Sequence, residues 1–113
     1  MPLFLARFGY TPEAWAGLVK DPQNREEAIR PVVEAAGAKL QGFWYAFGEC
    51  DGYILIDAPD TVSIASISTA TSASGALRLF ETTALITVDE MVEALKKASE
   101  LPYRAPMEAH AMA

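Results

Sequence analysis

The sequence is short of cysteine and histidine, and this shortage excludes several kinds of site. Cys50 is the only cysteine and His110 the only histidine. One cysteine cannot form a disulfide within the chain, and this pair cannot supply the usual ligand set of a zinc site or a histidine triad for haem. We therefore expect no metal and no cofactor, and the cytoplasm as the reducing compartment that suits the protein.

Positive charge and long apolar runs are also scarce. Nine Lys and Arg residues stand against fifteen Asp and Glu residues, so the formal net charge is −6. Without a basic cluster to contact phosphates, nucleic acid is excluded as an expected partner. The apolar run at the N-terminus reaches Arg7 after a few residues and is too short for a signal peptide or a membrane span, so we expect no membrane partner.

Apolar residues are plentiful: they make up 51% of the 113 residues, against 21% charged residues. This composition is typical of a globular chain, and the length suits one domain. Hydrophobic periodicity stops after Leu101, and two prolines follow. We therefore predict a single domain over residues 1–101 and a C-terminal tail over residues 102–113.

The residue pattern predicts strands alternating with helices. Apolar runs predict strands at 3–9, 38–47, 53–58 and 76–87. Helices are expected from Pro12 to about Val19, from Asn24 to Gly37, from Asp60 to Gly75 and from Val88 to Ser99. Pro31 predicts a kink or a late start in the second helix. This order gives an α+β ferredoxin-like fold, a split β-α-β arrangement with a four-stranded antiparallel sheet and helices on one face.

Both faces of the predicted sheet carry apolar side chains. A sheet face in contact with water would alternate to polar residues, but apolar residues occupy both parities at Leu3, Phe4, Leu5 and Phe8 and again at Phe43, Trp44 and Tyr45. Something must cover the second face. The simplest candidate is a second copy packed sheet to sheet in a twofold homodimer, a dimeric α+β barrel.

A ligand site is predicted between the sheet and its helices, lined by Trp44, Tyr45 and Tyr53 with Arg7 as an anchor for an anionic group. Aromatic walls with a few polar tips are typical of apolar ligand pockets, although the same residues also suit a packed core. Arg7 lies in an apolar strand, so it either pairs with a carboxylate such as Glu81 or Asp57 or holds a ligand oxygen. Strand parity places Trp44 and Tyr45 on opposite faces, so only one of them can line a given cavity.

No catalytic group can be identified. Glu49, Asp51 and Asp57 form the nearest approach to a carboxylate cluster, but acidic residues in a turn commonly make local backbone hydrogen bonds. The acidic neighbours of Cys50 disfavour its thiolate. Two functions stay open: a small-molecule binding or interaction module, and a cofactor-free enzyme that would need a general base.

The chain resembles the GYD-domain family over residues 3–98. The resemblance rests on Lys20 to Pro22 with Arg25, Phe43 to Tyr45 before Gly48 to Asp51, Asp57 to Asp60, and Thr82 and Thr83 with Leu85. Cys50 stands where the family usually has Tyr, so no role of that aromatic is carried over. The resemblance implies a ferredoxin-like domain related to dimeric α+β barrels, and no activity.

The function that we expect is accordingly that of an uncharacterised GYD-type domain: a homo-oligomeric module that binds a small apolar ligand or another partner. The alternative is a cofactor-free monooxygenase or isomerase acting on a small aromatic or apolar substrate. These enzymes, like some haem-dependent ones, are similar to the family in fold alone, and fold does not carry function.

Overall fold

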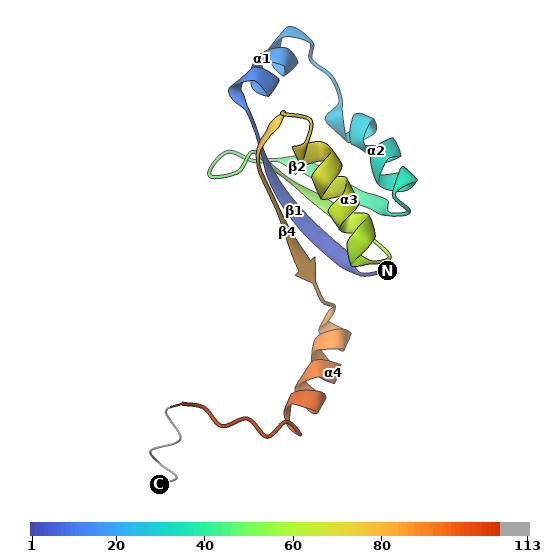
Figure 1. Ribbon diagram of the computed structural model, residues 1–113, viewed down its shortest axis with the longest axis vertical. Helices are drawn as coiled ribbons and strands as arrows, with labels where there is room; N and C mark the ends of the chain where they lie inside the picture. The colour runs from blue at the N-terminus through green and yellow to red at the C-terminus, as the bar shows by residue number, and fades with distance from the viewer. Residues whose placement is uncertain (107–113) are drawn as a thin grey trace.

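A computed structural model describes residues 1–106 of the chain, and its elements follow the predicted order (Figure 1). They are β1 (Leu3–Tyr10), α1 (Pro12–Lys20), α2 (Arg25–Ala35), β2 (Lys39–Tyr45), β3 (Gly52–Asp57), α3 (Thr61–Ser72), β4 (Leu77–Leu85) and α4 (Val88–Ala98). The strands form one four-stranded sheet in the order β2-β3-β1-β4, and every neighbouring pair is antiparallel. The predicted α+β ferredoxin-like fold is confirmed.

Local signals in the sequence set the ends of the first three helices. Thr11, Asn24 and Asp60 each accept a hydrogen bond from the backbone N–H three residues further on, which satisfies a donor that the helix leaves unpaired. The bonds from Ser63 lower the pKa of the Asp60 carboxyl. Gly37 and Gly75 follow α2 and α3 with φ of 82° and 81°, a conformation that glycine adopts most readily. α2 begins at Arg25 and continues past its internal proline, so the helix does not start late.

The core lies on one face of the sheet, between the strands and α2 and α3. Alternate residues of β1 point into it and are buried: Phe4, Ala6, Phe8 and Tyr10. They pack with residues of β2, β3, α2 and α3, among which the most deeply buried are Leu40, Ile54, Ile56, Val33, Ile64 and Ile67. α2 packs on β2 and α3 packs on β4, so the two helices cover opposite halves of this face.

Two irregularities in the strand pairing change which side chains share a face. The register of β2 shifts between Leu40 and Gly42, so that Phe43 opposes Ile54 on the helix-covered face. The pairing of β1 with β4 shifts between Gly9 and Tyr10. This second shift brings both Leu77 and Phe80 against the core although they are three residues apart in one strand.

The other side of the sheet, here called the open face, is not covered by a described helix. Its central row runs from Trp44 to Tyr53, Arg7 and Glu81, which are direct neighbours in the strand register. Leucines flank this row at Leu3, Leu5, Leu55, Leu79 and Leu85, all partly exposed. Trp44 is 54% exposed. The open face therefore combines partly exposed apolar side chains with a charged pair.

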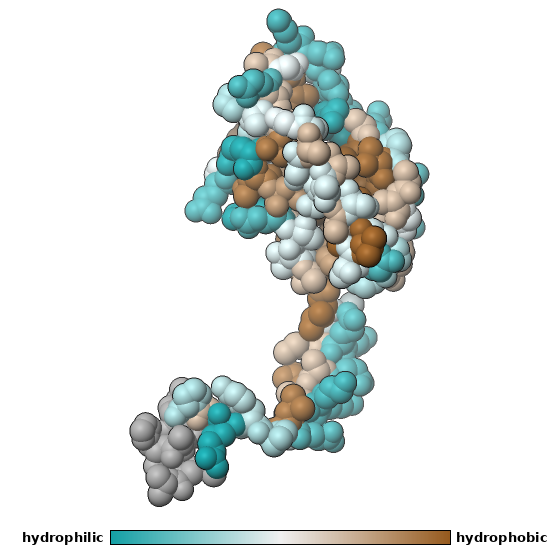
Figure 2. Space-filling model, in the orientation of Figure 1, coloured by the Kyte–Doolittle hydropathy of each residue, from teal (hydrophilic) through white to brown (hydrophobic). Residues whose placement is uncertain are grey.

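Helix α4 extends away from the sheet (Figure 1) and buries no residue. A capping box between Thr87 and Glu90 fixes its start. One side of α4 is apolar and the other is charged (Figure 2), and the apolar side chains Val88, Met91, Val92 and Leu95 are all exposed. No helix within residues 1–106 has the length and apolar character needed to cross a bilayer.

The predicted domain boundary after residue 101 is not tested by the fold. Residues 102–106 form neither a helix nor a strand. The remainder of the predicted tail, with His110, lies outside the described residues.

Gly52 gives the first testable prediction. A Cβ at this position would meet the ring of Phe8 and the backbone oxygen of Trp44, both at 2.5 Å, so Gly52→Ala forces the backbone or the core to shift. We expect a loss of about 1–3 kcal/mol in the free energy of unfolding, measured by urea denaturation. The matched control is Gly48→Ala in the adjacent loop, where nothing lies within 4 Å of the added methyl group. Equal stability of the two variants would contradict this packing.

Candidate functional site

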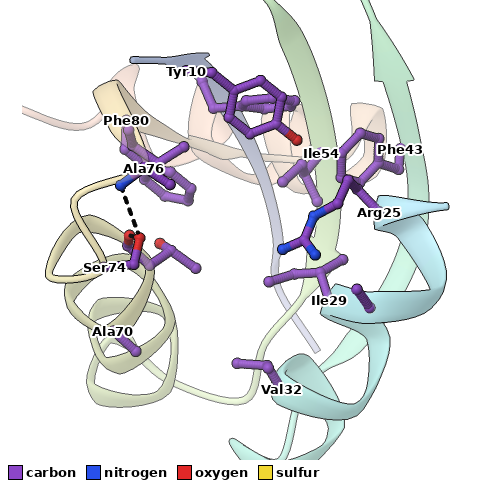
Figure 3. A pocket seen from close by; sticks show the side chains of 14 residues that line it. Tyr10, Arg25, Ile29, Val32, Phe43, Ile54, Ala70, Ser74, Ala76 and Phe80 are labelled. Atoms are coloured by element: carbon purple, nitrogen blue, oxygen red, sulfur yellow. Dashed lines mark hydrogen bonds between the residues drawn. The ribbon is translucent and has the colours of Figure 1, made fainter. Parts of the chain in front are cut away.

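A pocket of about 250 Å³ lies between α2 and α3, above the central strands of the sheet (Figure 3). It forms because α2 covers β2 and α3 covers β4, which leaves part of β1 and β3 between the helices. We call it the helix-side pocket. Most of its lining is apolar, and its floor comprises the side chains of Phe8, Phe43, Ile54, Leu77 and Phe80.

The hydroxyl groups of α3 and the residues after it are largely engaged at the rim of this pocket. The Thr71 hydroxyl donates to the backbone oxygen of Ile67 at 2.9 Å, and the Ser74 hydroxyl donates to that of Thr71 at 2.6 Å. The Ser74 oxygen also accepts from the Ala76 N–H at 3.2 Å. These hydroxyl groups are therefore occupied by hydrogen bonds to the backbone at the C-terminal end of α3.

Tyr10 gives the pocket a polar tip backed by an aromatic cluster. Its ring packs edge-on against Phe8 and Trp15, with centroids 5.1 and 5.0 Å away. Its hydroxyl lies 3.3 Å from that of Tyr45. Burial, and then the hydrogen bond to Tyr45, raises the pKa of the Tyr10 hydroxyl well above its usual value. Tyr10 therefore presents a neutral hydroxyl.

Asp51 holds this aromatic cluster in place. Its carboxylate accepts hydrogen bonds from the Tyr10 backbone N–H at 2.8 Å and from the Trp15 indole N–H at 3.3 Å. It also pairs with Arg78 at 3.3 Å, and its side chain is only 16% exposed. One carboxylate thereby joins β1, α1, β4 and the loop before β3, which assigns Asp51 a structural role.

Arg25 is the cationic group of the helix-side pocket. It is the first residue of α2 and half-buried, and its side chain extends toward the pocket interior (Figure 3). Its guanidinium donates to the side-chain oxygen of Gln23 at 2.7 Å, and the Gln23 amide in turn donates to Asp21. Within residues 1–106, no carboxylate oxygen lies within the 4 Å that defines an ion pair with Arg25.

The sequence-predicted site residues divide between the two faces. Tyr45 lies on the helix-covered face behind Tyr10. Arg7, Trp44 and Tyr53 lie together on the open face, so the expected position between the sheet and the helices is wrong for these three. The register enforces this result, because residues directly opposite one another in a sheet share a face. Whether any of the four residues binds a ligand stays a prediction.

The charge of Arg7 is already neutralised. Its guanidinium donates to both carboxylate oxygens of Glu81, at 3.0 and 3.2 Å, and lies 3.6 Å from Glu49. This bidentate pair raises the pKa of Arg7 and lowers that of the Glu81 carboxyl. Of the two roles expected for Arg7, the fold therefore shows the pairing with a carboxylate.

A second hollow, of about 260 Å³, lies beside this pair and is lined by Arg7, Phe47, Cys50 and Tyr53 among others. Its cation is already paired with carboxylates. Cys50 is buried, and its nearby thiol raises the pKa of the Tyr53 hydroxyl. These contacts account for the polar groups of the hollow, so it is the weaker ligand site.

The acidic residues that the sequence groups together are separated in the fold. Asp51 contacts Tyr10, whereas Asp57 at the far end of β3 accepts a hydrogen bond from Gln41. Among residues 1–106, no group of three His, Cys, Asp or Glu side chains is placed to hold a metal ion.

Sequence reasoning missed Tyr10 and Arg25, the ionisable groups among the described lining of the helix-side pocket. One signal for Arg25 was available: a cation in the first turn of a helix is disfavoured by the helix dipole, so its presence calls for another reason. Tyr10 gave no such signal, because it reads as the end of an apolar strand.

Comparison with known proteins identifies a family and a fold. The family model of the GYD domain matches residues 4–95. The crystal structure of MtbAldR aligns with a TM-score of 0.54 and 16% identity over 93% of this chain. An uncharacterized NIPSNAP domain protein from Burkholderia xenovorans aligns with a TM-score of 0.43 and 15% identity, over 78% of this chain and 95% of its own. No curated protein matches the chain.

These likenesses carry different weight. The chain spans 58% of the length of MtbAldR, and at such low identity the likeness shows the fold alone. The alignment with the Burkholderia protein is too loose to support an argument.

The environment of Tyr10 predicts a delayed alkaline titration. Because the pKa of its hydroxyl is raised on folding, the stability that this group contributes is fully present below the unfolded pKa of about 10. It is lost as the pH rises from there through the folded pKa. We expect the tyrosinate absorbance of the protein, minus that of Tyr10→Phe, to titrate with a midpoint above 10. A midpoint at or below 10 would contradict the buried setting.

Proposed function

The chain belongs to the GYD-domain family, and we propose that it acts as a homo-oligomeric module whose helix-side pocket binds a small, largely apolar molecule. The single cysteine favours the cytoplasm as its location. The observation that carries the proposal is the pocket itself, an apolar hollow of about 250 Å³ whose ionisable lining residues, Tyr10 and Arg25, project from different elements. Apolar walls with a few converging polar groups are what small-molecule sites present.

The size of the pocket limits the ligand. Pockets for drug-sized molecules measure about 300–1,000 Å³, so this one suits a molecule of about one or two rings. Among the lining residues, Ala28 on α2 and Ala70 on α3 are exposed and have short side chains, so the mouth of the pocket lies between these two helices.

Binding is favoured over catalysis by the side chains of the pocket. The ionisable residues among its described lining are Tyr10 and Arg25. A tyrosine whose pKa is raised is a poor base at neutral pH, and a guanidinium stays protonated. A cofactor-free oxygenase or isomerase needs a group that removes a proton from its substrate, so the pocket better supports a binding role.

A second copy of the chain is the partner that we propose for the open face. Four strands of about eight residues form a sheet whose flat area is on the order of 500 Å², and the uneven surface of the side chains adds to this area. A standard interface buries about 800 Å² per partner. The charged groups in the centre of this face are already paired, Arg7 with Glu81, so association would bury no unpaired charge there.

The exposed apolar side of α4 adds to this proposal. Two residues, Ile86 and Thr87, connect β4 to α4, and the helix points beyond the end of the sheet (Figure 1). A linker this short makes it difficult for α4 to fold back over the open face of its own sheet. A second copy packed on that face would offer the apolar side of α4 a surface to contact.

Ligand binding is tested by thermal unfolding in the presence of small aromatic compounds. A compound that binds only the folded chain raises the unfolding midpoint as its concentration increases. We expect this rise with phenylpropanamide and related compounds of one ring. The variant Ala70→Phe, which fills the mouth of the pocket, should abolish it. Ala65→Phe, exposed on the same helix but away from the pocket, is the control and should retain it. A rise that persists in Ala70→Phe would place the ligand elsewhere.

Self-association is tested by sedimentation of the chain at micromolar concentration, where we expect a dimer or a multiple of one. Trp44→Glu puts a charge in the open face and should yield monomers, because a carboxylate without a partner is costly to bury. Val62→Glu is the control, since Val62 is 76% exposed on α3, outside the open face. Circular dichroism verifies that both variants fold. A monomeric parent chain, or a Trp44→Glu variant that still dimerises, would remove the open face from the interface.

A further inference from the structure

We infer that the ligand of the helix-side pocket is an anion, a small aryl or alkyl carboxylate whose charged group is held by Arg25. This inference rests on the proposed function and adds the chemistry of the head group. Arg25 was not among the residues that the sequence pointed to as ligand contacts. What distinguishes Arg25 is that Arg7 is paired with carboxylates in the folded chain, whereas no ion pair to Arg25 occurs within residues 1–106.

The two arginines nearest the candidate sites differ in their partners. Arg7 makes a bidentate contact with Glu81 and lies close to Glu49, so its charge is balanced. Arg25 donates to Gln23, whose side chain is neutral, and no ion pair joins Arg25 to a carboxylate within residues 1–106. Arg25 therefore keeps a whole positive charge to offer to a ligand.

The surroundings of Arg25 make this charge effective. It is half-buried beside apolar side chains, including Ile29 and Phe43 (Figure 3), and an ionic contact is stronger where water is partly excluded. The chain as a whole has a net charge of −6, which repels anions, so an anion bound here must be attracted locally. The guanidinium is also planar and matches the two oxygens of a carboxylate.

Gln23 and Tyr10 complete the arrangement. The exposed Gln23 side chain accepts from the guanidinium and donates to Asp21, which limits the rotamers of Arg25. The Tyr10 hydroxyl lies close enough to Arg25 for the two groups to influence each other. A carboxylate placed beside both groups would accept from a cation and from a neutral hydroxyl. The apolar part of the ligand would then lie on Phe8 and Phe80.

The test compares acids with their neutral amides. Benzoate, phenylacetate and phenylpropanoate are each measured against the corresponding primary amide by calorimetry and thermal unfolding. Each acid should bind about ten- to a hundredfold more tightly than its amide, the range expected for one charged hydrogen-bonded contact. Arg25→Gln should remove this preference by weakening the binding of acids more than that of amides, whereas Arg25→Lys should retain part of it.

The control is Arg30→Gln on the same helix. It removes the same charge, but Arg30 pairs with Glu26 and does not line the pocket, so the preference for acids should persist. Unfolding midpoints without ligand verify that each variant is folded. An acid preference that survives in Arg25→Gln would overturn the inference.

The outcomes also separate this inference from the proposed function. If acids and amides bind equally, and both are lost in Ala70→Phe, the pocket binds ligands but the anionic head group is wrong. If no compound of the panel binds, or if binding persists in Ala70→Phe, the pocket itself is wrong and both proposals fail.

Discussion

The packing of Phe8 on the bare backbone of Gly52 is the contact on which the site depends. The two residues are partners in the β1–β3 register, and the ring lies only 2.5 Å from where a Cβ on Gly52 would stand. Phe8 is almost fully buried and contacts the rings of Tyr10 and Phe43. The side chains that form the floor of the helix-side pocket are therefore fixed in position, because close-packed aromatic rings leave little room for repacking.

The distribution of charge follows from which side of the sheet each arginine occupies. Arg7 projects from a central strand onto the open face, next to Glu81 on β4, and the register alone brings the two together. Arg25 begins a helix at the other face, where the polar neighbour is Gln23. Paired charges contribute to the fold and are poorly available to ligands, whereas a half-buried cation with a neutral neighbour stays available to one. The two arginines are chemically identical, and only their surroundings distinguish them.

The open face and the pocket impose different requirements on the same strands. Side chains of alternating parity serve the two faces, as Trp44 and Tyr45 illustrate, so a substitution on one face leaves the other largely intact. A second copy on the open face would bury its leucines without covering the pocket mouth between α2 and α3. Ligand binding and self-association can therefore be separated by variants, and neither proposal requires the other.

The sequence by itself determined the order of elements, the helix caps at Thr11, Asn24 and Asp60, and the opposite parity of Trp44 and Tyr45, because these depend on neighbours along the chain. It also offered Glu81 and Asp57 as partners for Arg7, without choosing between them. Only the tertiary structure decided which face the helices cover, and hence that Arg7, Trp44 and Tyr53 lie away from them. It also decided that two register shifts bring Phe43, Leu77 and Phe80 into one pocket with Arg25. Apolar residues of both parities are compatible with either choice of covered face, and a shift in register depends on the partner strand, which no local pattern encodes.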